Sequence, residues 1–81
     1  MQSEDPASDM AVLDVTGLQC HLPVLKAQKA LRDLQSGELL KVISTDPMAT
    51  IDIPHFCKEH GHTLRAQQPR ESDTVYILQK K

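Results

Sequence analysis

The chain has 81 residues, 40% of them hydrophobic, and a formal net charge of -2 from 9 basic and 11 acidic residues. This length holds one domain with one small core. The charge balance argues against direct nucleic-acid binding, which usually requires a basic stripe. No apolar run approaches the roughly 20 residues of a membrane-spanning helix, so no membrane contact is expected.

Residues 1–10 carry few apolar side chains and are expected to form a flexible tail before a single domain over residues 11–81. The first six residues are polar and acidic, which fits neither a signal peptide nor a transit peptide. A cytoplasmic location is therefore expected, where thiols stay reduced. The two cysteines are accordingly interpreted as reactive or buried thiols rather than as a disulfide.

Residues 11–15 are predicted to form a short strand that ends at Thr16 and Gly17. The next segment repeats apolar residues at steps of three and four, namely Val24, Ala27, Leu31 and Leu34. This spacing gives one apolar face and predicts a helix over residues 23–35. Pro23 fits the first turn of that helix, and Gly37 is the glycine expected just past its end.

The apolar, β-branched residues 39–44 are predicted to form a central strand. Asp46 before Pro47 then indicates a turn. Pro54 argues against one long helix through residues 48–60, so Asp52 is predicted to be the N-cap of a second helix with Pro54 in its first turn. Residues 47–51 would form an irregular turn. Gly61 is predicted to end this helix.

The last two strands are predicted at residues 63–67 and 74–78, joined by a polar loop over residues 69–73. The order of elements is βαβαββ. It predicts an α/β (α+β) two-layer sandwich, in which two helices cover one face of a four-stranded mixed sheet. One Phe, one Tyr and no Trp predict an aliphatic core.

Cys20 is the candidate catalytic residue. It lies between the first strand and the first helix, where free N–H groups and the positive end of the helix dipole favour a thiolate. A lowered thiol pKa makes a better nucleophile at neutral pH. Lys26, Lys29 and, when protonated, His21 add positive potential there. The alternative is an inert, buried loop cysteine.

Cys57 is expected to be a buried core thiol, because it shares one helix face with Ile53, Phe56 and His60. A resolving partner for Cys20 is the alternative. The histidines raise the question of zinc, but the sequence lacks the paired ligand spacing of a structural site, so neither metal nor cofactor is expected. His60 is expected at the rim of the core, and His55 and His62 at the surface.

A basic helix face formed by Lys26, Lys29 and Arg32 is open to two interpretations. Such charges are usually solvated, but they also suit the docking of an acidic protein partner. Asp46 and Asp52 are interpreted as turn and cap residues rather than as acid–base catalysts.

Two motifs resemble those of the TusA/SirA family. The first is Leu13-Asp14-x-x-Gly17-Leu18-x-Cys20-x-x-Pro23-Val24-Leu25-Lys26, which is similar to the family's opening segment with its Cys-Pro-x-Pro motif. The second comprises Asp46-Pro47, Asp52-Ile53-Pro54-x-x-Cys57 and Gly61-His62. The resemblance covers residues 11–81. Position 21 departs from it, because His21 replaces the first motif proline and brings an N–H donor and a titratable ring.

The resemblance implies the two-layer sandwich described above and a sulfurtransferase-like role in sulfur trafficking. Cys20 would carry sulfane sulfur as a persulfide. The partners implied are a donor such as a cysteine desulfurase or rhodanese and a downstream acceptor protein, with His21, Lys26, Lys29 and Arg32 as the contact residues. Family members serve tRNA 2-thiolation, and relatives act in sulfur oxidation or are linked to selenium metabolism. A monomer is expected.

Two alternatives come from other functional classes. The first is a thiol-based regulatory or interaction module without sulfur transfer. The second is a zinc-binding domain that uses Cys20 or Cys57 with histidines.

Overall fold

A computed structural model describes residues 11–19 and 22–81. It contains β1 (Ala11–Asp14), α1 (Leu22–Arg32), β2 (Leu39–Ser44), α2 (Ala49–His60), β3 (Thr63–Pro69) and β4 (Thr74–Gln79). This order confirms the predicted βαβαββ arrangement. The predictions for the tail, residues 1–10, and for Cys20 and His21 lie outside the described residues.

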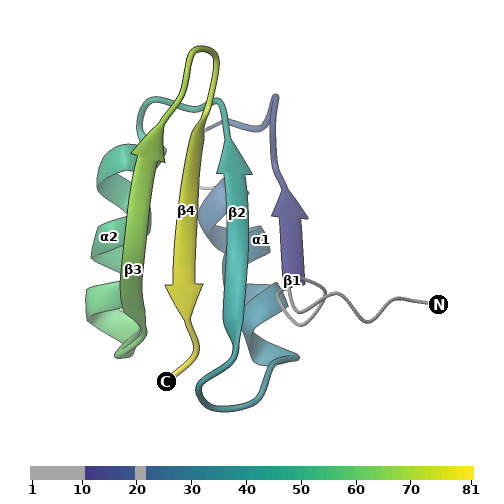
Figure 1. Ribbon diagram of the computed structural model, residues 1–81, viewed down its shortest axis with the longest axis vertical. Helices are drawn as coiled ribbons and strands as arrows, with labels where there is room; N and C mark the ends of the chain where they lie inside the picture. The colour runs from purple at the N-terminus through teal and green to yellow at the C-terminus, as the bar shows by residue number, and fades with distance from the viewer. Residues whose placement is uncertain (1–10, 20–21) are drawn as a thin grey trace, which may run out of the picture.

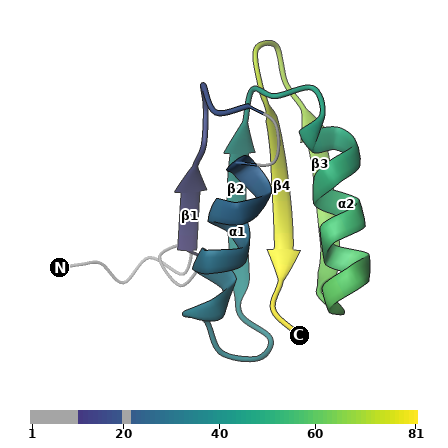
Figure 2. The same ribbon diagram turned by 180° about the vertical axis from the view of Figure 1, so that it is seen from behind.

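The four strands form one mixed sheet in the order β1-β2-β4-β3. β1 runs parallel to β2, whereas β4 is antiparallel to both β2 and β3. The central position predicted for residues 39–44 is therefore confirmed. Figures 1 and 2 show both helices on the same face of the sheet, as the sequence predicted.

The core lies between the sheet and the helices, and its strand residues alternate with those on the open face. On β2, Leu40 and Val42 face the helices, and Tyr76 and Leu78 do so on β4. The core is mainly aliphatic, as predicted, but Tyr76 and Phe56 are also buried in it. Composition limits how many aromatic residues exist, but strand register decides which face they occupy.

Helix α1 is one residue longer at its start and three shorter at its end than predicted. Its C-terminal turn tightens, since the N–H of Asp33 donates to the Ala30 carbonyl at 3.2 Å and that of Leu34 to the Leu31 carbonyl at 3.0 Å. Leu34 still packs against the core. Gly37 belongs to the following turn, with φ of 88°, and its N–H donates to the Lys80 carbonyl.

Helix α2 begins at Ala49, so the prediction of Asp52 as its N-cap is wrong. The turn at 46–48 supplies the acceptors for the first N–H groups: Ala49 donates to Asp46, Thr50 to Pro47, and Ile51 and Asp52 to Met48. Pro54 therefore lies inside the helix. It removes one hydrogen bond, to the carbonyl of the exposed Thr50. Gly61 ends the helix with φ of 79°, as predicted.

The last two strands extend beyond their predicted ends, to Pro69 in β3 and Gln79 in β4. β3 contains an irregularity between Leu64 and Ala66. Pro69 is tolerated because β3 is an edge strand, where the missing N–H breaks no central ladder.

Candidate functional site

Both helices start at the same end of the sheet. β1 and β2 are parallel neighbours, and each is followed by a helix that runs back along the sheet. Figure 2 shows the starts of α1 and α2 near the carboxyl ends of these strands. The positive ends of two helix dipoles therefore point toward one region of the molecule.

The loop after β1 leads into this region and is held by hydrogen bonds. The N–H of Val15 donates to the Ile43 carbonyl at 2.8 Å, and the N–H of Gly17, with φ of 85°, donates to Thr45 Oγ1 at 2.8 Å. Asp14 Oδ1 accepts the N–H of Thr16 at 3.0 Å, and this bond lowers the pKa of Asp14.

The loop joins α1 through the N–H of Leu22, which donates to the Gln19 carbonyl at 3.3 Å. Cys20 and His21, between these two residues, lie outside the described part of the chain. The role of Cys20 as the working thiol stays a prediction. The described residues on either side show that a hydrogen-bonded loop precedes positions 20 and 21 in the chain and that α1 follows them.

The surface around the helix starts carries exposed apolar side chains: Leu22 and Leu25 on α1, and Met48 and Ile51 at the start of α2. Lys26, Lys29 and Arg32 are exposed along α1, which contains no acidic residue. The structure therefore presents exposed apolar side chains near the start of each helix and three cations along α1.

Cys57 lies in the core, as predicted. Its side chain is 2% exposed on the inner face of α2, and burial raises the pKa of its thiol to about 11. A thiol in this state is protonated at neutral pH and is a poor nucleophile.

The three described histidines, His55, His60 and His62, differ in exposure and in the side chains that they contact. His55 is exposed and lies 3.5 Å from Glu59. His60 is exposed, yet its ring packs against Phe56 with centroids 4.8 Å apart, which fits the predicted rim position. His62, expected at the surface, is half-buried against Phe56 at 5.6 Å.

His62 is held in place by the last residue of the chain, because its Nδ1 accepts the N–H of Lys81 at 3.1 Å. Burial lowers the pKa of His62, and the nearby Lys80, His60 and Lys81 lower it further. Within residues 11–19 and 22–81, no group of three or more histidine, cysteine, aspartate or glutamate side chains is arranged to hold a metal ion.

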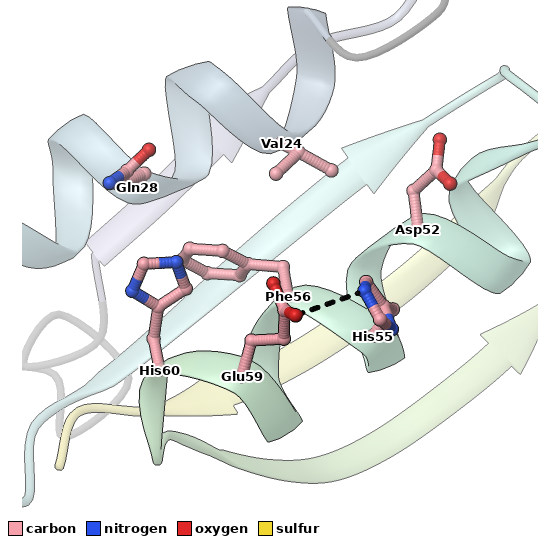
Figure 3. Close-up of a pocket in the computed structure, with 7 residues that line it drawn as sticks. All are labelled: Val24, Gln28, Asp52, His55, Phe56, Glu59 and His60. Atoms are coloured by element: carbon pink, nitrogen blue, oxygen red, sulfur yellow. Dashed lines mark ion pairs between the residues drawn. The ribbon is translucent and has the colours of Figure 1, made fainter.

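A groove of about 350 Å³ lies between α1 and α2. Figure 3 shows Val24 and Gln28 of α1 across from Phe56 of α2. The groove is completed by Asp52, His55, Glu59 and His60. Sequence reasoning missed it, although these α2 residues repeat at helical spacing on one face.

None of the helices in the described ranges is long and apolar enough to cross a bilayer.

The chain forms a small two-layer α+β domain in which both helices start at the same end of the sheet. Residues 11–80 match the family model described as Sulfurtransferase TusA. The chain therefore belongs to the TusA family.

Two relatives illustrate the similarity. The chain is 51% identical over 71 residues to the sulfur carrier protein TusA of Pseudomonas syringae pv. tomato, an alignment that covers 88% of this chain and 84% of the relative. It is 48% identical over 71 residues to the sulfur carrier protein TusA of Pseudomonas paraeruginosa, with 88% and 90% covered.

Proposed function

We propose that this protein is a sulfur carrier in which Cys20 accepts sulfane sulfur as a persulfide and passes it to a protein partner. The observation that carries the proposal is the similarity, over nearly the whole described chain, to relatives named sulfur carrier proteins. The position of Cys20, two residues before α1, supports it, because a helix N-terminus favours a thiolate.

The chemistry is a thiol–disulfide type of exchange. The Cys20 thiolate attacks the outer sulfur of a donor persulfide, R–S–SH, and the donor leaves as the thiolate R–S⁻. The product is Cys20–S–SH, and the proton stays on the transferred sulfur. An acceptor thiolate then attacks this outer sulfur and releases the Cys20 thiolate, so neither step needs an external oxidant or reductant.

The proposed partner-binding surface is the exposed face of α1, the helix that follows Cys20 in the sequence. Lys26, Lys29 and Arg32 attract an acidic rim on the partner, and the neighbouring Leu22 and Leu25 offer apolar contact. His21 is assigned to the same surface from its place in the sequence. The partners are a donor protein, such as a cysteine desulfurase or rhodanese, and a downstream acceptor protein.

Sulfur loading tests the proposal. Incubation with inorganic polysulfide should add one sulfur atom to the protein, which intact-mass spectrometry detects and dithiothreitol reverses. Cys57→Ser should load normally because its thiol is buried and protonated, whereas Cys20→Ser should not load. His21→Pro should still load.

Equal loading of Cys20→Ser and the unchanged protein would contradict the proposal. It would leave a thiol-based interaction module as the better assignment. Zinc found in the purified protein would instead favour a zinc-binding domain.

A further inference from the structure

The groove between α1 and α2 has an acidic wall on α2 (Figure 3). Asp52, His55, Phe56 and Glu59 follow the spacing i, i+3, i+4 and i+7, so they lie along one face of this helix. Phe56 is 4% exposed and gives the groove an apolar base. The two carboxylates lie toward opposite ends of this wall.

The wall on α1 is uncharged. It is formed by Val24 and Gln28, which are half-buried and one helical turn apart. At 3.6 residues per turn, Lys26 lies about 200° and Lys29 about 140° around the helix from Val24. The groove is therefore a different surface from the cationic face of α1.

The groove is anionic. With its histidines neutral, its lining carries two negative charges, from Asp52 and Glu59, and no lysine or arginine is among the described residues that form it. His55 Nε2 lies 3.5 Å from Glu59 Oε2, and both side chains are exposed. Charge complementarity therefore favours a cationic occupant.

Arginine side chains suit this lining best. A guanidinium group binds carboxylates through two parallel hydrogen bonds and stacks on aromatic rings, and its aliphatic stem can lie on Val24 and Phe56. Seven residues of helix separate Asp52 from Glu59, a rise of about 10 Å. One side chain is too short to bind both carboxylates, but two side chains at the same spacing on a partner helix can do so.

We propose that this groove docks a basic helical segment of a protein partner. Two arginines, seven positions apart, bind Asp52 and Glu59, and an apolar side chain between them packs on Val24 and Phe56. The volume of about 350 Å³ is at the small end for ligand sites, so the groove takes side chains of a helix that lies across it. This surface goes beyond the proposed sulfur-carrier function and adds an anionic docking site to the cationic face of α1.

Titration of the isotopically labelled protein with a synthetic peptide, followed by NMR, tests the docking. The probe is an alanine-rich peptide of about 15 residues, long enough to form a helix, with two arginines seven positions apart and a leucine between them. The amide resonances of residues 24–28 and 52–60 should shift on binding. The same peptide with glutamates in place of the arginines should leave them unchanged.

The double variant Asp52→Asn/Glu59→Gln nearly keeps the shape of the groove and removes its charge. It should weaken binding of the arginine peptide by about 3- to 10-fold, as expected for the loss of two exposed ion pairs. Asp33→Asn/Glu71→Gln is the matched control, because it removes the same charge from exposed positions outside the groove. Its affinity should be nearly unchanged. Binding to the unchanged protein should also weaken at high salt, a measurement that needs no variant.

The proposal would be overturned if the arginine peptide caused no shifts, if the shifts lay on other surfaces, or if both double variants weakened binding equally. Shifts of the groove amides with protein concentration alone would instead assign the groove to a second copy of the chain. Equal affinity for spermidine would assign it to a small polycation, and either result would also overturn the proposal. Sulfur loading is measured separately, so failure of the sulfur-carrier function is distinguishable from failure of this docking.

Discussion

The two cysteines occupy contrasting places in the chain. Cys57 lies on the inner face of α2, and the cost of burying a thiolate raises its pKa to about 11. Cys20 lies two residues before α1 in the sequence, and a helix N-terminus favours a thiolate. The thiol of Cys57 is therefore expected to be inert, and the thiol of Cys20 is expected to be nucleophilic.

A mild thiol reagent should consequently label Cys20 first and leave Cys57 until the protein is denatured. Peptide mapping after a short exposure to iodoacetamide at pH 7 measures the two rates. Cys57→Ser serves as the control and should label at the unchanged rate. Equal labelling of both cysteines in the native protein would contradict the inert state assigned to Cys57.

His60 and His62 show which histidine positions the neighbouring sequence can predict and which it cannot. The rim position of His60 follows from its helical spacing to Phe56, and the ring contact at 4.8 Å agrees with it. The half-buried state of His62 does not follow from the sequence nearby. It depends on Lys81, which is 19 residues away along the chain and donates to its Nδ1.

The spacing of apolar residues along α1 correctly predicted most of the buried face of this helix. Ala27 and Leu31 are buried as predicted, whereas Val24 lies at the groove and Leu34 lies beyond the helix end. Leu31 is 1% exposed, while Leu25 on the same helix is 49% exposed. The two leucines form a matched pair for testing the packing.

Leu31→Ala should destabilise the protein by about 2–5 kcal/mol, since it removes buried methyl groups and leaves a cavity. Leu25→Ala should change stability by less than about 1 kcal/mol, as exposed substitutions usually do. Urea denaturation followed by circular dichroism measures both. If Leu25→Ala proved the more destabilising of the two, α1 would have to be rotated from its assigned face.

The start of α2 at Ala49 differs from the start predicted from the position of Pro54. Proline is disfavoured inside a helix, so Pro54 suggested a start at Asp52. The turn at residues 46–48 provides acceptors for four N–H groups before Pro54 is reached, and α2 therefore starts at Ala49. The buried apolar face of Ile53, Phe56 and Cys57 supplies the packing that offsets the single lost hydrogen bond.

At the scale of the whole molecule, distant segments are joined near the end of α1. Lys80 Nζ donates to the Leu31 carbonyl at 2.7 Å, 49 residues away in the sequence, and places a cation at the negative end of the helix dipole. The N–H of Lys80 also donates to the Glu38 carbonyl. The starts of α1 and α2 lie at the opposite end of the sheet (Figure 2).

Charge reversal along α1 should affect transfer between proteins but not loading by small molecules. The double variant Lys26→Glu/Lys29→Glu should slow sulfur transfer from a cysteine desulfurase, because it replaces attraction to an acidic surface by repulsion. Loading from polysulfide should be unchanged. The transfer rate, measured by mass spectrometry at low and high salt, should lose most of its salt dependence in the variant.

Lys58→Glu, an exposed change of the same kind on α2, is the control and should transfer at nearly the unchanged rate. If it slowed transfer as strongly as the α1 variant, the effect would reflect net charge rather than a docking surface.

The sequence by itself determined the order of elements, the central place of β2, the burial of Cys57 and the position of Cys20 before α1. Each follows from apolar periodicity or from neighbours only a few residues away, which act within one strand or helix turn. Tertiary structure alone decided the start of α2, the burial of Tyr76, the groove between the helices and the contact of Thr45 with Gly17. Those features depend on strand register and on groups brought together from distant parts of the chain, which local spacing does not specify.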